Sequence, residues 1–117
     1  MATLRTIPKP EWRTFFDQMS KALLGKRAEI EVASLDLGDQ VIAEWIPLLG
    51  VTFEPNGDVL DVALEGANHL IRRPQQIAID EAPAGGITSI AVTSADGASH
   101  VIRLKSPVML TATTRLS

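Results

Sequence analysis

The hydrophobic period of the sequence changes once, close to Arg27, from that of a helix to that of a strand. Up to residue 24, apolar side chains recur at helical spacing, at Trp12, Phe15, Phe16, Met19, Leu23 and Leu24. Beyond Arg27, apolar and polar residues alternate, as in a strand with one buried face. A chain ordered in this way is expected to fold as one helix packed on an antiparallel sheet.

Residues 10–24 are predicted to form the helix. Pro10 suits the first helical position, where its missing N–H costs nothing. Gly25 suits the left-handed residue that ends a helix. The buried face should contain the aromatic and long aliphatic residues of the segment, namely Trp12, Phe15, Phe16, Met19 and Leu23.

The residues that follow are expected to form five or six short antiparallel strands. Pro47 and Gly50 interrupt the long extended segment of residues 40–53, which predicts a bend or bulge there. Asn56-Gly57 is the favoured pair of a type I′ hairpin, so Gly57 should have a positive φ. A narrow, bent sheet of this kind covers its inner face with the helix or by curling into a barrel.

The predicted fold class is therefore α+β and mainly β. An N-terminal amphipathic helix packs on a small, curved antiparallel meander or on a partial barrel of the SH3 or Sm-like kind, an analogy of layout only. We expect a single domain over residues 1–117, with the β region at about 28–104 and a C-terminal tail at 105–117. The apolar tail residues 108–114 should pair with an edge of their own sheet or of a neighbouring copy.

Composition limits the environment of the chain. The sequence has no cysteine, which excludes disulfides and thiolate metal sites and favours a reducing compartment. The longest uncharged apolar run, residues 45–53, is far shorter than the roughly 20 residues of a membrane-spanning helix. The N-terminal segment has no apolar core of a secretory signal. A soluble cytoplasmic protein without a membrane segment is expected.

Charge is distributed unevenly around the net value of −3. Residues 28–66 contain nine acidic residues and no Lys or Arg, whereas the segments on either side are net basic. The acidic middle is expected to pair with the basic ends, within the fold or between subunits. Neither arrangement favours nucleic acid, which requires a net basic face.

The sequence contains no recognisable frame for catalysis or metal binding. His69 and His100 lie far apart, and neither has a second ligand at a metal-binding spacing. Ser, His and Asp are scattered, without a nucleophile elbow or a glycine-rich phosphate loop. We therefore expect no metal, no cofactor, no catalytic residue and no enzymatic activity.

Residues 68–80 contain the most suggestive candidate site. His69, Arg72 and Arg73 are expected to be solvated, with Leu70 or Ile71 pointing inward, and Pro74 should break the ladder. The arginines should face the acidic middle of the chain. The alternative is that His69, Arg72 and Arg73 contact an anion or a partner.

Four segments together resemble a known family: "IPKPEWRTFF", "PLLGVTFEPNGDVLDVALEG", "HLIRRPQQIAIDE" and "SADGASHVIRL". Their order and spacing resemble a family of small, mostly bacterial proteins that is classed only as a domain of unknown function. The resemblance covers about residues 5 to 110 and implies a single compact domain. It implies no activity, cofactor or catalytic residue.

The leading hypothesis is a non-enzymatic domain that acts through protein contacts, mainly with its own copies. An Sm-like nucleic-acid-binding protein is the first alternative, because Lys26, Arg27, Arg72, Arg73, Arg103 and Lys105 could converge on one rim. Single-strand binding also needs exposed aromatic residues, and Trp45 and Phe53 are expected in the core. The second alternative is a small-ligand or anion binder, or an enzyme, with a site near Arg72 and Arg73.

Overall fold

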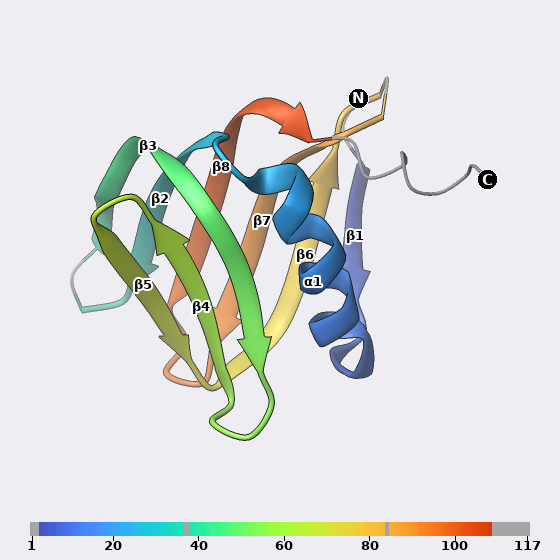
Figure 1. The fold of residues 1–117 in the computed structure, drawn as a ribbon. Helices are drawn as coiled ribbons and strands as arrows, with labels where there is room; N and C mark the ends of the chain where they lie inside the picture. The colour runs from blue at the N-terminus through green and yellow to red at the C-terminus, as the bar shows by residue number, and fades with distance from the viewer. Residues whose placement is uncertain (1–2, 37, 84, 109–117) are drawn as a thin grey trace.

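The computed structural model describes residues 3–36, 38–83 and 85–108. These residues form one short 3-10 turn, one α-helix and eight strands (Figure 1). In chain order the elements are β1 (Thr3–Ile7), η1 (Lys9–Glu11), α1 (Trp12–Leu23), β2 (Arg27–Ser34), β3 (Gly38–Glu54), β4 (Val59–Leu64), β5 (Ala67–Arg72), β6 (Pro74–Glu81), β7 (Ile87–Ser94) and β8 (Ser99–Val108).

All eight strands belong to one antiparallel sheet with the order β1-β6-β7-β8-β2-β3-β4-β5. The sheet curls strongly, so that β4 and β5 lie in front of the layer formed by β7, β8 and β2 (Figure 1). Helix α1 lies beside β3 on the same concave side. The sheet does not close into a barrel, because β1 and β5 remain at opposite edges. The mainly β, α+β class is confirmed.

The curl originates in β3, which is shared by two parts of the sheet. Residues 38–47 pair with β2, whereas residues 48–54 pair with β4. Trp45 has φ 52°, and the pairing register shifts between Leu48 and Gly50. Both irregularities increase local bending, which confirms the bend predicted around Pro47 and Gly50.

Helix α1 covers the core where β2 no longer pairs with β3. Trp12, Phe16, Met19 and Leu23 are buried, and Phe15 is partly buried against them. The hydroxyl of Ser20 donates to the carbonyl of Val51 at 2.7 Å and accepts from the Val51 N–H at 3.0 Å. After the helix, Gly25 has the left-handed φ of 82° expected from the sequence. The chain then makes two backbone bonds with Leu48 before entering β2.

The structure corrects the predicted number of strands. The described residues form eight strands rather than five or six, and β1 was not expected. Strand β8 extends through Val108, which is buried and lies opposite Ile87, so residues 105–108 are not part of a tail. The rest of the predicted tail, residues 109–117, lies outside the described residues.

The β3–β4 hairpin also differs from its predicted form. Glu54 pairs with Val59, which leaves a four-residue loop. The loop residue with positive φ is Asp58, at 52°, and Gly57 has no positive φ. The type I′ prediction was therefore wrong, because the longer loop moves the left-handed position one residue along the chain. Phe53 and Leu60 do pair and are buried as predicted.

Candidate functional site

The two histidines of the chain meet inside the curl of the sheet. His69 projects from the edge strand β5 and His100 from the central strand β8, and Nε2 of His69 lies 3.0 Å from Nδ1 of His100. Their rings are tilted by 42° with centroids 5.2 Å apart. His100 is buried and His69 is half-buried. The contact joins two strands that are not neighbours in the sheet.

Both positions follow from strand alternation. In β5, His69 and Ile71 share one face, and Ile71 is buried. In β8, His100 lies on the face that also buries Ile102 and Leu104. Curling of the sheet brings these two inner faces together.

Ser94 and Asp96 extend the contact into the β7–β8 turn. The Ser94 hydroxyl lies 2.5 Å from Oδ1 of Asp96 and 3.2 Å from Nε2 of His100. Oδ1 of Asp96 also accepts the N–H of Ala98 at 3.1 Å, and the Ser94 N–H bonds to the Ala98 carbonyl at 3.0 Å. The turn therefore fixes the carboxylate beside the hydroxyl.

The number of protons that each group can donate sets the direction of the hydrogen bonds. An ionised Asp96 only accepts, and its Oδ1 lies nearer to the Ser94 oxygen, at 2.5 Å, than the Ala98 carbonyl does, at 3.3 Å, so the single hydroxyl proton of Ser94 points to Asp96. The Ser94 oxygen must then accept from His100, which places the His100 proton on Nε2 and leaves Nδ1 as an acceptor. His69 donates its Nε2–H to that acceptor. The donors run in one direction, from His69 through His100 and Ser94 to Asp96.

Burial and charge act differently on the three titratable groups. Burial lowers the pKa of His69, and the nearby His100 lowers it further. Burial also lowers the pKa of His100, against an opposing effect of Asp96. The hydrogen bond from Ser94, supported by the Ala98 N–H, lowers the pKa of Asp96. At neutral pH both imidazoles are therefore neutral and Asp96 is ionised.

The order of groups is not that of a nucleophilic triad. In such a triad a histidine accepts the serine proton, whereas here the proton of Ser94 points to Asp96 and His100 donates to Ser94. Ser94 is also buried. Among the described residues, no group of three or more His, Cys, Asp or Glu side chains is placed to hold a metal ion.

The structure separates the residues that the sequence grouped as a candidate site. His69 points inward to His100, so the expectation that it would be solvated was wrong. Arg72 lies on the opposite face of β5 and is exposed, and Arg73 is exposed at the corner between β5 and β6. Arg73 has φ 51° and is held there by backbone bonds to Asp58 and Ala95.

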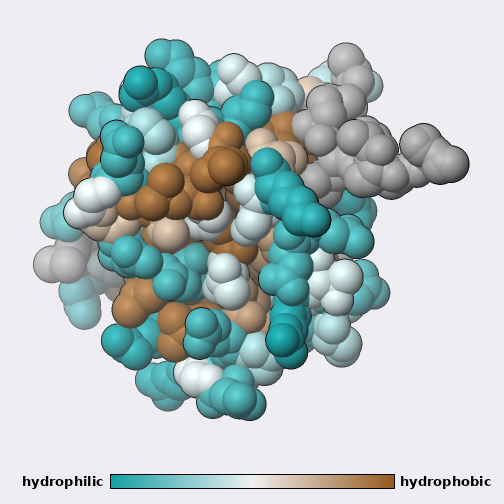
Figure 2. All heavy atoms as spheres, viewed as in Figure 1, coloured by the Kyte–Doolittle hydropathy of each residue, from teal (hydrophilic) through white to brown (hydrophobic). Residues whose placement is uncertain are grey.

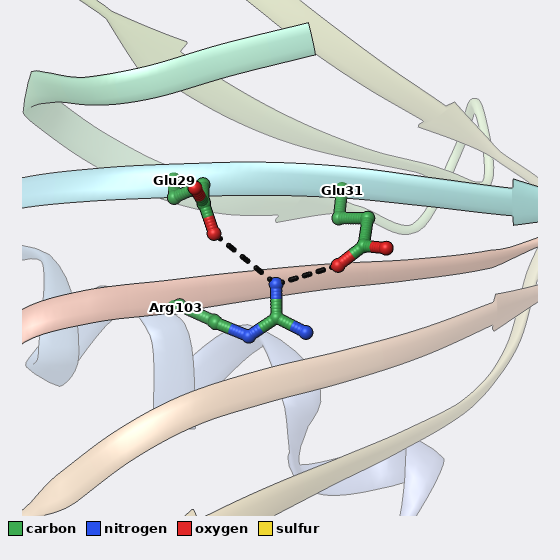
Figure 3. A network of polar contacts seen from close by, with 3 residues as sticks. All are labelled: Glu29, Glu31 and Arg103. Carbon is green, nitrogen blue, oxygen red and sulfur yellow. Dashed lines mark hydrogen bonds and ion pairs between the residues drawn. The ribbon is translucent and has the colours of Figure 1, made fainter. Parts of the chain in front are cut away.

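The arginines of this stretch do not pair with the acidic middle of the chain within the described residues. That role belongs to Arg103 of β8, which lies between Glu29 and Glu31 of β2 on the convex face (Figure 3). Its Nη1 atom is 3.2 Å from Glu29 and 2.7 Å from Glu31. The hydrogen bond from Arg103 lowers the pKa of Glu31. Together with the pair between Lys9 and Asp58, it places three of the nine acidic residues of the middle segment in ion pairs with basic residues inside the fold.

Sequence reasoning missed His100 as the partner of His69, and Ser94 and Asp96 as the groups that continue the contact beyond His100. One signal was available for the inward position of His69: it lies two residues from Ile71, so the two side chains share one face of the strand. The side-chain contact between β5 and β8 across the curl leaves no local sequence pattern, so His100 could not be selected. Trp45, predicted in the core, is only partly buried and lies beneath the Lys105 ammonium, 5.9 Å from its ring centroid.

No helix among the described residues has the length and apolar character that crossing a membrane requires. The chain is 38% identical over 111 residues to an uncharacterized protein of the bacterium Aquifex aeolicus (strain VF5), covering 94% of this chain and 98% of that protein. No solved structure matches it. A family model described as a family of unknown function, DUF5335, matches residues 3–113. The resemblance found in the sequence is thereby confirmed: the chain belongs to the family of unknown function DUF5335.

Proposed function

We propose that this chain is a non-enzymatic protein-contact domain that assembles with copies of itself by pairing two strand edges. One edge is the outer side of β5, and the other is the outer side of β3 over residues 38–46. The observation that carries the proposal is that both edges lack a neighbouring strand among the described residues and have exposed apolar side chains. Exposed strand edges of this kind readily pair with another chain.

The free edge of β3 results from the change of partner within that strand. Strand β4 pairs only with residues 48–54, so no strand lies on that side of residues 38–46 in the part of the chain described. Val41 and Ile42 point to opposite faces and are 51% and 46% exposed. By contrast, residues 48–54 of β3 pair with β4 on one side, and their other side is covered by α1, where Ser20 bonds Val51. The fold protects one edge and leaves the other open.

The free edge of β5 has a complementary character. Leu70 is 43% exposed, and Arg72 is exposed on the same face. Figure 2 shows apolar surface over the upper part of β3 and again over β4 and β5. Burial of such patches against one another is favourable by roughly 25 cal/mol per Å². Pairing of the two edges would therefore remove exposed apolar side chains of both from water, which is favourable.

Charge selects a register for this pairing. If β5 and β3 of two copies run antiparallel with Leu70 opposite Val41, Arg72 falls opposite Asp39. Neither Arg72 nor Asp39 has an oppositely charged partner among the described residues. Residues 28–66 contain no Lys or Arg, so a cation for Asp39 must come from another part of the chain or from another copy. Such a surface ion pair adds specificity more than affinity.

The absence of enzymatic activity is part of the proposal, supported by the direction of the hydrogen bonds through Ser94. The cytoplasmic location is part of it as well, supported by the cysteine-free sequence.

A charge exchange tests the proposal. Sedimentation equilibrium of the full chain over a range of concentrations should show reversible association. Arg72→Glu and Asp39→Lys should each weaken it, because each places like charges opposite one another. The double variant should restore association. Arg13→Glu makes the same charge change on the exposed face of α1 and should behave as the wild type.

Two results would reject the proposal. A monomeric wild-type chain at every concentration would exclude self-association. Association of either single variant at wild-type strength would exclude these edges as the interface.

A further inference from the structure

We infer that His69 and His100 form a one-proton site that acts as a pH-sensitive latch between the edge strand β5 and the centre of the sheet. Their contact is the only side-chain hydrogen bond, among the described residues, that joins β5 to a strand other than β4. The latch requires no association between copies, so it is independent of the proposed function.

The geometry allows the pair to hold one added proton and opposes a second. A proton on Nδ1 of His69 leaves the Nε2–H of His69 free to donate to His100. A proton on His100 is tolerated if His69 turns its unprotonated nitrogen toward it. With both rings protonated, each contact nitrogen bears a hydrogen, and two N–H groups would face each other across 3.0 Å. The bond is then lost and two cations repel each other.

The surroundings provide little compensation for that second charge. The cross-strand neighbours are apolar: Val62 of β4 opposite His69, and Val32 of β2 and Val92 of β7 opposite His100. On β5 itself, Asn68 and Leu70 point to the other face, where Asn68 bonds Asp61. The charged group that faces the pair is Asp96, which contacts His100 through Ser94.

The direction of the pH effect follows from burial. The pKa values of both histidines are lowered in the folded chain, whereas an unfolded or locally open chain has the ordinary value of about 6.5. Below that pH the open form binds more protons than the closed form, so closure weakens as pH falls. Above it both forms are neutral and the latch contributes fully. Acidification should therefore release β5 before the rest of the sheet.

The test uses the full chain and two NMR measurements between pH 5 and 8. Ring nitrogen shifts should show the Nε2–H tautomer of both histidines at neutral pH. Amide hydrogen exchange should show that protection in β5 falls as pH falls, by about tenfold for each pH unit and for each extra proton that the open form takes up. Strand β1, the opposite edge, should keep its protection over the same range.

His69→Gln is the matched variant. Its side-chain amide can donate to or accept from His100 but does not titrate over this range. The variant should lose clearly less β5 protection on acidification than the wild type, because only His100 can still take up a proton and no second imidazolium faces it. Wild-type β5 protection that does not change between pH 5 and 7 would overturn the latch, as would two histidines that titrate independently at the ordinary value. If His69→Gln loses as much β5 protection on acidification as the wild type, the pH effect comes from other groups and the latch is likewise overturned.

Discussion

Phe15 and Phe16 are adjacent in α1, and their rings meet edge to face with centroids 5.1 Å apart, yet their surroundings differ. Phe16 is fully buried, whereas Phe15 lies at the margin of the core. We expect Phe16→Ala to lower the free energy of unfolding by about 3–5 kcal/mol. Phe15→Ala should cost about 1 kcal/mol. Urea denaturation of the two variants checks this, and equal costs would contradict the observed orientation of the helix.

The β3–β4 loop provides a second residue-scale prediction. Asp58 has φ 52°, a region that β-branched residues resist, whereas Gly57 does not use its freedom. Asp58→Val should cost about 1–3 kcal/mol. Gly57→Ala should stay within about 0.5 kcal/mol, because its new Cβ would meet Val59 at an ordinary 3.9 Å.

Asp58→Asn is the control for that experiment. Asparagine tolerates the left-handed region, so this variant removes the charge opposite Lys9 and keeps the backbone. A cost for Asn as large as for Val, measured by thermal unfolding, would assign the effect to the ion pair instead.

Single residues were predictable from the sequence where a local pattern determined their environment. The spacing of Trp12, Phe16 and Met19 predicted their burial correctly. The environment of His69 depended on a strand that follows it by about 30 residues, and the left-handed residue of the hairpin depended on the loop length. Neither the distant strand nor the loop length can be read from the neighbouring residues, so these two predictions failed.

At the scale of elements, one hydroxyl makes both of the hydrogen bonds described between α1 and β3. Ser20→Ala would leave the N–H and the carbonyl of Val51 without their side-chain partner. We expect a loss of about 1–3 kcal/mol in the free energy of unfolding, the cost of unpaired buried polar groups. Thr14→Ala, on the exposed side of the same helix, should change it by less than about 0.5 kcal/mol. Similar values in chemical denaturation would show that water replaces the hydroxyl.

Elements with a strong local period were predicted from the sequence, and elements defined by distant partners were not. Helix α1 and the bent β3 were expected within a few residues of their bounds. Strand β1 was missed because, of its residues 4–7, only Ile7 is buried. Its partner β6 lies about 70 residues further along the chain, and such a pairing leaves no local pattern.

At the scale of the whole molecule, the C-terminal part of β8 completes the sheet. Val108 is buried opposite Ile87. A chain that ends at Lys105 should therefore lose about 1.5–3 kcal/mol of stability, the value of burying one aliphatic side chain. A chain that ends at Val108 retains this buried side chain and should be more stable than the chain that ends at Lys105 in the same urea titration. Equal stability of the two shortened chains would contradict the pairing of Val108.

The chain ending at Val108 also tests the apolar tail predicted to take part in self-association. Removal of residues 109–117 without any change in sedimentation would reject that role. The pairing of β5 with β3 does not depend on it.

Nucleic-acid binding is a further property of the whole surface. Arg103, one of the six basic residues that could have formed a common rim, lies between two glutamates. We expect only weak binding to mixed RNA and DNA in a polarisation assay, falling steeply with salt. Sub-micromolar binding that persists at moderate salt would contradict this expectation.

The position of β8 has a consequence for how the protein is made. Strand β8 lies between β7 and β2, so it joins the strands β1, β6 and β7 to the strands β2 to β5. It is nevertheless the last of the described strands to leave the ribosome. Until it emerges, β2 to β5 and β6 to β7 have no strand that connects them, and the inner faces of both remain open to water. Completion of the sheet therefore waits for the end of synthesis, and it is governed by contacts between distant residues, which form slowly and leave apolar surface exposed in the meantime.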